Sequence, residues 1–229
     1  MQEIVVISGK GGTGKTSLSA SFAALAKNAI LADCDVDAAD LHLLLAPEIR
    51  RREPFISGHE AVIATQDCIA CGECRKLCRY DAVQVTEVAG KSTYRIDPLA
   101  CEGCGLCVLA CPVFAIAFPE RNCGEWYVSE TRCGTMVHAR LHPGAENSGR
   151  LVTLVRNEAR HIAQELSREL ILVDGPPGIG CPVIASLTGA TVVLAVAEPT
   201  VSGAHDLERV LQLARHFGIK AAVCVNKWD

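Results

Sequence analysis

The sequence has few aromatic residues, no basic block and no long apolar run. Only 4% of its 229 residues are aromatic whereas 49% are hydrophobic, so we expect an aliphatic core. The net charge is −4, and no basic helix supports binding to nucleic acid or to an anionic membrane surface. No apolar stretch is long enough to span a bilayer, and Met1 leads directly into a strand pattern without an export signal. These absences predict a cytoplasmic protein with no nucleic-acid or membrane partner.

Cysteine, by contrast, is abundant, with thirteen residues. Disulfides would be unusual in a chain without an export signal, and the spacing of these cysteines is that of metal ligands. Eight of them lie between residues 68 and 111, in two runs that share the spacing C-x2-C-x2-C-x3-C. We therefore expect a metalloprotein in a reducing, oxygen-poor compartment.

This double run is the ligand pattern of a bacterial-type two-cluster ferredoxin. Three closely spaced thiolates bind one [4Fe–4S] cluster, and the fourth cysteine of each run reaches the other cluster. The pattern assigns Cys68, Cys71, Cys74 and Cys111 to cluster 1, and Cys101, Cys104, Cys107 and Cys78 to cluster 2. Zinc at paired C-x-x-C sites is the alternative. Arg79 replaces the usual proline after the fourth cysteine, and residues 85–97 form a longer connector that we expect to be a hairpin turning at Gly90.

A glycine-rich loop follows the apolar run 4–7 and precedes a helix-like segment at 18–27. This is the setting of a phosphate-binding loop, whose backbone N–H groups turn around phosphate oxygens. Lys15 would reach the β and γ phosphates, and the Thr16 hydroxyl would bind Mg²⁺. The sequence therefore predicts a nucleoside triphosphate site formed by Gly9, Lys10, Gly11, Gly12, Thr13, Gly14, Lys15, Thr16 and Ser17.

Carboxylates follow two further apolar strand patterns. Asp33 and Asp35 follow a run that ends at Ala32, and Asp174 follows a run that ends at Val173. Ligands bind at the carboxyl ends of strands in α/β sheets, so these side chains are candidates for the same site. The position of Asp174 matches a Walker B aspartate, which would hold Mg²⁺. For Asp33 and Asp35, the alternative role is to cap the short helix that follows them.

The cysteine-rich segment interrupts an alternation of strands and helices that resumes after it. We predict an α/β P-loop NTPase domain with a mainly parallel sheet at residues 1–62 and 121–229, with a small α+β ferredoxin-like domain inserted at 63–120. The basic triplet at 50–52 is expected to be a solvated surface turn. Because the sheet ends near Asn226, we expect the natural protein to continue beyond residue 229.

The motifs together resemble the MinD superfamily of P-loop ATPases, which includes MinD, ParA, Mrp and the nitrogenase iron protein. The resemblance rests on the deviant Walker A loop K-G-G-x-G-K-[T/S], the D-x-D segment, the D-G-P-P-G-I-G-C switch segment and the N-K-x-D end, with the eight-cysteine insertion between them. It implies an ATPase that binds ATP and Mg²⁺ as a nucleotide-dependent homodimer, or as a heterodimer with a paralogue.

The resemblance also implies roles for single residues. Lys10 would cross the dimer interface to the partner's nucleotide, Asp35 would orient the attacking water, and Asn226 would contact the base; the catalytic residues would be Lys10, Lys15 and Asp35. N-K-x-D is also the guanine-reading motif of GTPases, so GTP stays open as the nucleotide.

In the nitrogenase iron protein, a cysteine at the spacing of Cys181 ligates a cluster that bridges two subunits. The resemblance therefore marks Cys181 as a possible interface thiol, with packing at a helix start as the alternative.

The leading functional hypothesis is an ATPase whose nucleotide state controls cluster chemistry, in iron–sulfur or metal-cofactor assembly or transfer to an acceptor protein. The first alternative is an ATP-gated electron donor like the nitrogenase iron protein. The second is a positioning ATPase of the MinD or ParA type with a redox-sensing ferredoxin module. The sequence names no acceptor for any of the three.

Overall fold

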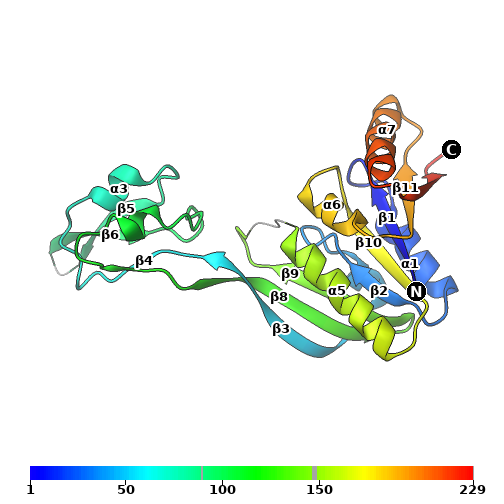
Figure 1. Ribbon diagram of the computed structural model, residues 1–229, viewed down its shortest axis with the longest axis horizontal. Helices are drawn as coiled ribbons and strands as arrows, with labels where there is room; N and C mark the ends of the chain where they lie inside the picture. Colours follow the sequence, from blue (N-terminus) through cyan, green and yellow to red (C-terminus); the bar gives the residue numbers. More distant parts are fainter. Residues whose placement is uncertain (89, 146–148, 229) are drawn as a thin grey trace. The chain divides into compact units, whose positions relative to one another are not determined.

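The computed structural model describes residues 1–88, 90–145 and 149–228, and these residues form two compact units (Figure 1). The first unit contains residues 1–54, residues 124–142 and the described part of the chain beyond residue 148. The second contains residues 55–123 and 143–145. The second unit therefore begins and ends within the sequence of the first.

The first unit is built on an eight-stranded sheet. Its strands are β1 (Gln2–Ser8), β2 (Ile30–Asp33), β3 (Glu48–His59), β8 (Glu120–Thr131), β9 (Gly134–Leu141), β10 (Leu170–Pro177), β11 (Val192–Ala197) and β12 (Lys220–Val225). The order is β12-β11-β1-β10-β2-β9-β8-β3. The pairings from β12 to β9 are parallel, and β8 joins β9 antiparallel. The predicted α/β class with a mainly parallel sheet is confirmed.

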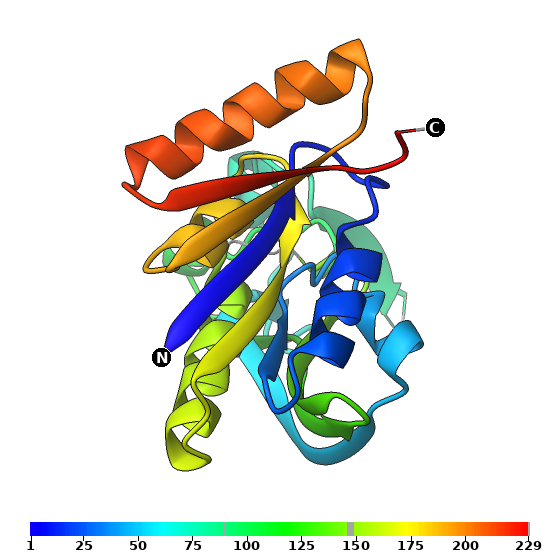
Figure 2. The ribbon, with the colours of Figure 1, turned by 90° about the vertical axis from the view of Figure 1, so that its right-hand side faces the viewer.

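Helices cover both faces of this sheet, as its apolar strands require. Val5, Val6 and Ile7 of β1 are at most 1% exposed, the pattern of a parallel strand that is buried on both sides. The helices of this unit are α1 (Lys15–Leu25), α2 (Leu41–Leu45), α5 (Arg150–Glu165), α6 (Cys181–Leu187) and α7 (Val201–His216). Figure 2 shows α1 and α5 on opposite sides of the strands. Within the described ranges, no helix combines the length and the apolar character needed to cross a bilayer.

A buried ion-pair network joins β1, α5 and α6. Glu3 Oε1 accepts a hydrogen bond from Arg156 Nε at 2.6 Å, and Glu3 Oε2 accepts one from Arg160 Nη2 at 2.7 Å. Arg156 also donates through Nη1 to the carbonyl oxygens of Ala185 and Thr188, at 2.5 and 2.9 Å. Because Arg156 is only 2% exposed, loss of Glu3 would leave a buried guanidinium without its carboxylate. The network therefore fixes the C-terminal end of α6, the helix that begins at Cys181.

The second unit is small and made of short elements. It contains β4 (Val62–Ile63), α3 (Glu73–Leu77), β5 (Val83–Val88), β6 (Lys91–Ile96), α4 (Leu106–Leu109) and β7 (Ile116–Ala117). β4 pairs antiparallel with β7, and β5 pairs antiparallel with β6 across the turn at Gly90, where φ is +75°. The hairpin predicted at Gly90 is therefore present. Its buried core includes Ala82, Val83, Ile96 and Ile116 together with Cys74 and Cys101.

Two details differ from the sequence predictions. The turn predicted at 50–52 is wrong, because these residues lie within β3, where Arg51 stacks over Trp126 and Arg52 forms an ion pair with Glu125 of β8. The second unit spans residues 55–123, wider than the predicted insertion at 63–120, because β3 and β8 continue across its boundaries. The sequence pattern also predicts a turn at 147–149, and its residues Asn147 and Ser148 lie outside the described residues, as does Asp229 of the N-K-x-D end.

His138 gives the first unit a predictable pH dependence. It is 7% exposed, and burial, with a smaller contribution from His42, lowers its pKa to about 4. The unfolded chain, with an ordinary pKa near 6.5, takes up a proton that the folded chain excludes. Stability should therefore fall as the pH drops from about 6.5 to 4, by at most about 3 kcal/mol.

His138→Gln should flatten this dependence, since glutamine does not titrate. The measurement is the urea midpoint at pH 7 and pH 5 for wild type and variant. His161→Gln, at an exposed position on α5, is the matched control and should keep the wild-type dependence. Equal slopes for wild type and His138→Gln would show that this histidine is not the group responsible.

Candidate functional site

The glycine-rich loop lies between β1 and α1 at the carboxyl edge of the sheet. Gly12 and Gly14 have φ values of +79° and +94°, which side chains other than glycine rarely adopt. A Cβ on Gly14 would also lie 2.4 Å from Nδ2 of Asn226. α1 begins at Lys15, so its free N–H groups face the loop. The loop has the backbone geometry that phosphate binding needs.

Three carboxylates and one lysine meet beside this loop. Lys15 is 5% exposed, and its Nζ lies 3.2 Å from Asp35 Oδ2. Asp33 is the last residue of β2, and it pairs with Asp174 of β10. Ser19 of α1 donates its hydroxyl to Asp174 Oδ1 at 2.9 Å. The predicted residues Lys15, Asp35 and Asp174 are thus brought together from three separate elements.

The three buried carboxylates beside Lys15 favour the binding of an additional cation. Burial raises the pKa of Asp33 well above its ordinary value, and the carboxylates of Asp174 and Asp35 raise it further. Burial likewise raises the pKa of Asp174, although Lys15, Thr16 and Ser19 oppose this effect. Burial also raises the pKa of Asp35, against the influence of Lys15. One lysine does not compensate three buried carboxylates.

Buried oxygens without a partner mark where a ligand fits. Asp33 Oδ2, Asp174 Oδ2 and Thr13 Oγ1 have no hydrogen-bond partner among the described residues. Carboxylate and hydroxyl oxygens are the ligands that Mg²⁺ prefers, usually together with water and phosphate oxygens. The residues present therefore fit a magnesium nucleotide. The assignment of Thr16 and Asp174 to the metal and of Lys15 to the phosphates stays a prediction.

Lys10 is held within its own chain by a residue that the sequence analysis did not single out. Its Nζ lies 2.8 Å from Glu198 Oε2, and Lys227 Nζ lies 2.6 Å from Glu198 Oε1. Hydrogen bonds from these two lysines lower the pKa of Glu198 to about 2. Glu198 directly follows β11, so its position after an apolar strand was a signal of the kind that identified Asp174.

The C-terminal residues contact the backbone of the loop. Asn226 donates through Nδ2 to the carbonyl oxygen of Thr13 at 2.8 Å, and Lys227 donates through Nζ to that of Gly12 at 2.7 Å. The structure thus places the Asn226 amide on the loop itself. The predicted contact with a base concerns a bound nucleotide and stays a prediction.

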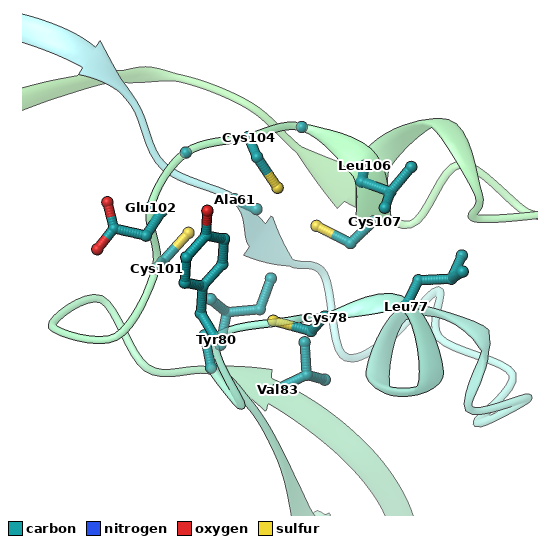
Figure 3. A pocket seen from close by; sticks show the side chains of 14 residues that line it. Ala61, Leu77, Cys78, Tyr80, Val83, Cys101, Glu102, Cys104, Leu106 and Cys107 are labelled. Carbon is teal, nitrogen blue, oxygen red and sulfur yellow. The ribbon is translucent and has the colours of Figure 1, made fainter.

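Eight of the cysteines of the second unit line two separate hollows. One hollow is lined by Cys78, Cys101, Cys104 and Cys107, and Figure 3 shows their sulfur atoms turned toward one common space. The other hollow is lined by Cys68, Cys71, Cys74 and Cys111. These are the same two sets of four that the spacing predicts for cluster 2 and cluster 1. In each hollow, the fourth cysteine of one run lies together with the first three cysteines of the other run.

The backbone of the two runs repeats with an offset of 33 residues. Ala70 and Gly103 have φ values of +55° and +62°, and Gly72 and Gly105 have values of +80° and +73°. Asp81 and Phe114, three residues after each fourth cysteine, repeat at +50° and +54°. Left-handed residues at equivalent positions wrap each loop around its hollow, an arrangement that suits a compact cluster with one thiolate on each iron. A single metal ion would need its ligand atoms to converge more tightly. Among the described residues, no three His, Cys, Asp or Glu side chains are grouped closely enough to hold one metal ion.

The remaining cysteines lie outside the two sets. Cys181 is exposed and is the first residue of α6. Cys123 is buried, and its Sγ lies 3.2 Å from the carbonyl oxygen of Ser57. Cys34 is completely buried, and burial raises its pKa well above the ordinary value. Cys133 and Cys224 are half-buried. Of these five, Cys181 is the exposed thiol.

Known proteins resemble the chain in both of its parts. Residues 61–118 match the protein family described as a 4Fe-4S dicluster domain. The uncharacterized protein MJ0578 of Methanocaldococcus jannaschii is 33% identical, over 99% of this chain and 78% of its own length. The uncharacterized protein MJ0579 of the same organism is 27% identical, over 100% of this chain and 81% of its own length.

A solved structure resembles the whole chain in fold. The MinD cell division protein of Aquifex aeolicus aligns with a TM-score of 0.51 and 20% identity, over 100% of this chain and 70% of that chain. The predicted P-loop fold of the MinD type and the predicted iron–sulfur domain are confirmed. The chain therefore belongs to the family of the MJ0578 protein, and it has a MinD-type P-loop ATPase fold that carries an inserted 4Fe-4S dicluster domain.

Proposed function

We propose that this protein binds and hydrolyses ATP with Mg²⁺ as a nucleotide-dependent dimer, and that its nucleotide state controls electron delivery from two resident [4Fe–4S] clusters. The observation that carries the proposal is the presence, in one chain, of a buried Lys15 among three carboxylates and of two complete sets of four cysteines. The first provides for phosphate chemistry and the second for one-electron transfer.

In this proposal, Lys15 and the carboxylates have different roles at the bound nucleotide. Lys15 would exchange its contact with Asp35 for the β and γ phosphates, which frees Asp35 to orient the attacking water and accept its proton. Thr16 and Asp174 would hold Mg²⁺, which neutralises charge on the phosphates. Gly12 and Gly14 allow the N–H groups of the loop to face the same oxygens.

Lys10 connects hydrolysis to dimer formation in this proposal. Glu198 holds Lys10 within its own chain at 2.8 Å, and Lys227 provides a second cation for the same carboxylate. Lys227 can therefore keep Glu198 paired when Lys10 turns to the partner's nucleotide. A second chain, identical or paralogous, would supply the equivalent lysine in return.

Complete ligand sets favour electron delivery over cluster transfer. Each hollow is lined by four cysteines, so that a cluster bound there needs no external ligand and is held permanently. β3 and β8 connect the units covalently, and both belong to the sheet that carries Asp33 on β2. This continuity provides a physical route by which a change at the nucleotide could reach the clusters.

Cluster or metal-cofactor assembly is the second candidate, and Cys181 favours it. This thiol is exposed, lies outside both cysteine sets, and starts the helix that follows the switch segment. A cysteine in that position could take part in a transient site shared by two chains. Cluster transfer to an apo-acceptor that is lost in Cys181→Ala would support this candidate over electron delivery.

Two lysine substitutions test the nucleotide site. Lys15→Ala should abolish nucleotide binding, because it leaves the phosphates and the buried carboxylates without their lysine. Lys10→Ala should spare binding but lower hydrolysis by about 10³-fold, the smaller end of the effect of a cation supplied from a partner chain. Binding by calorimetry, steady-state phosphate release and nucleotide-dependent mass by light scattering give the three readouts.

The matched control is Lys27→Ala, at an exposed lysine of the same unit for which the described residues show no ion pair. It should behave as wild type in all three assays. Hydrolysis by Lys10→Ala at the wild-type rate would contradict the role across the dimer.

Asn226→Ala separates a contact with the base from support of the loop. Its amide donates to the carbonyl of Thr13, and loss of one such hydrogen bond should weaken ATP and GTP binding by the same factor, roughly 2- to 10-fold. Asn157→Ala, on an exposed part of α5, should change neither affinity. A change in the ratio of ATP to GTP affinity would instead show that Asn226 reads the base.

Coupling between nucleotide and clusters can be measured directly. We expect eight iron atoms per chain, and a shift of cluster potentials between the ADP-bound and the ATP-analogue-bound protein in an anaerobic redox titration followed by electron paramagnetic resonance. A shift of about 59 mV in a one-electron couple corresponds to about 1.4 kcal/mol of coupling.

Lys15→Ala is the control for this titration, because without nucleotide binding the two titrations should coincide. Cluster potentials that are equal with ADP and with the ATP analogue in the wild-type protein would contradict gated electron delivery. The dicluster domain would then be a cluster-handling or docking module.

A further inference from the structure

The turn from β11 into α7 fixes the backbone of Glu198. This residue directly follows β11, and its carbonyl oxygen accepts a hydrogen bond from the N–H of Thr200 at 2.8 Å. Thr200 in turn caps α7, because its Oγ1 accepts a hydrogen bond from the N–H of Gly203 at 3.0 Å. A Cβ on Gly203 would lie 2.4 Å from the carbonyl oxygen of Glu198, so the turn is closely packed. The Glu198 carboxylate is thus presented from a well-anchored turn.

This one carboxylate is shared by two lysines from opposite ends of the chain. Lys10 Nζ lies 2.8 Å from Glu198 Oε2, and Lys227 Nζ lies 2.6 Å from Glu198 Oε1, so each lysine has an oxygen of its own. The side chains of Lys10 and Lys227 are 36% and 56% exposed. Because water can solvate either ammonium group, one lysine can leave without stranding a buried charge, and the other keeps the carboxylate paired.

The two lysines are not equally free to leave. Lys227 Nζ also donates to the carbonyl oxygen of Gly12 at 2.7 Å, and its φ of +58° is uncommon for a residue other than glycine. The N–H of Asn226 donates to the carbonyl oxygen of Ala197 at 2.8 Å, which ties this segment to the end of β11. Among the described residues, Glu198 is the one ion-pair partner of Lys10. Lys10 is therefore the lysine that can exchange partners.

Such an exchange needs only the side chain of Lys10 to move. Ser8 Oγ donates to the carbonyl oxygen of Lys10 at 2.6 Å, which holds the backbone at this point of the loop. An ammonium group makes charge-assisted hydrogen bonds to carboxylate and phosphate oxygens alike. Glu198 and a phosphate group are therefore alternative partners of the same Lys10 ammonium group.

We propose that Glu198 is a positioning residue that holds Lys10 back in the single chain, so that its carboxylate competes with the partner's phosphates for Lys10 and weakens the nucleotide-bound dimer. Lys227 has the opposite effect, because it stays on Glu198 when Lys10 leaves and so eases the release. The inference rests on the proposed function, because it requires a nucleotide-dependent dimer in which Lys10 crosses the interface.

Glu198→Gln removes the charge and keeps the size of the side chain. We expect the dissociation constant of the dimer, measured by analytical ultracentrifugation with a saturating non-hydrolysable ATP analogue, to fall several-fold, because Lys10 is no longer held in its own chain. Lys227→Met should raise this constant several-fold, because Glu198 then loses its second cation. The double variant should resemble Glu198→Gln alone, since Lys227 acts through Glu198. Substitutions that merely loosen the fold would not shift the constant in opposite directions.

Glu208→Gln and Lys220→Met are the matched controls. Glu208 lies on an exposed part of α7, where it pairs with Arg215 at 3.5 Å, and Lys220 is exposed at the start of β12. These variants change the net charge as the test variants do, and both should keep the wild-type dissociation constant. Calorimetry with the analogue on every variant checks that the nucleotide site is saturated, which separates association of the chains from nucleotide binding.

The outcomes separate this inference from the proposed function. A dissociation constant that is unchanged or raised in Glu198→Gln, or that falls equally in Glu208→Gln, would overturn the proposal; a raised one would mean that Glu198 directs Lys10 toward the partner. A constant for Lys227→Met at or below the wild-type value would also overturn it. A wild-type chain that stays monomeric with the analogue bound would instead show that the proposed function fails.

Discussion

Three carboxylates share one lysine at the carboxyl edge of the sheet, and much of the first unit serves to hold them there. Asp33 ends β2 and pairs with Asp174 of the adjacent parallel strand β10, Asp35 follows β2, and Lys15 starts α1. Burial of these charges destabilises the chain unless a cation and phosphates complete the site. The fold thus keeps a binding site at the expense of stability, as functional sites often do.

In the second unit, too, a bound ligand would complete the structure, and there its binding groups are thiols. Its short elements bury little apolar surface, and cysteines such as Cys74 and Cys101 are part of its small core. Bound clusters would replace the hydrophobic core that so short a segment cannot build. The repeat of left-handed residues gives both cysteine loops the same backbone conformation.

Local patterns explain why so much was predictable. The phosphate-binding loop and the cysteine runs are short-range motifs, in which chemistry depends on the spacing of neighbours, and even the exchange of Cys78 and Cys111 between the two sets follows from that spacing. The basic triplet was predicted wrongly because its cross-strand partners, Trp126 and Glu125, lie more than 70 positions away in the sequence. Glu198 was missed for a similar reason, since its role depends on Lys10 and Lys227 at opposite ends of the chain.

The sequence by itself determined the chemistry available to this protein: a loop for phosphates, eight thiols in two runs, and a strand–helix alternation that specifies a parallel α/β sheet. Only the tertiary structure decided which distant groups meet. It paired Lys15 with Asp35, placed Asn226 on the loop, and joined Lys10 to Glu198. The physical reason is that these contacts depend on strand register and on packing between elements, and both are settled by burial across the whole fold rather than by neighbouring residues.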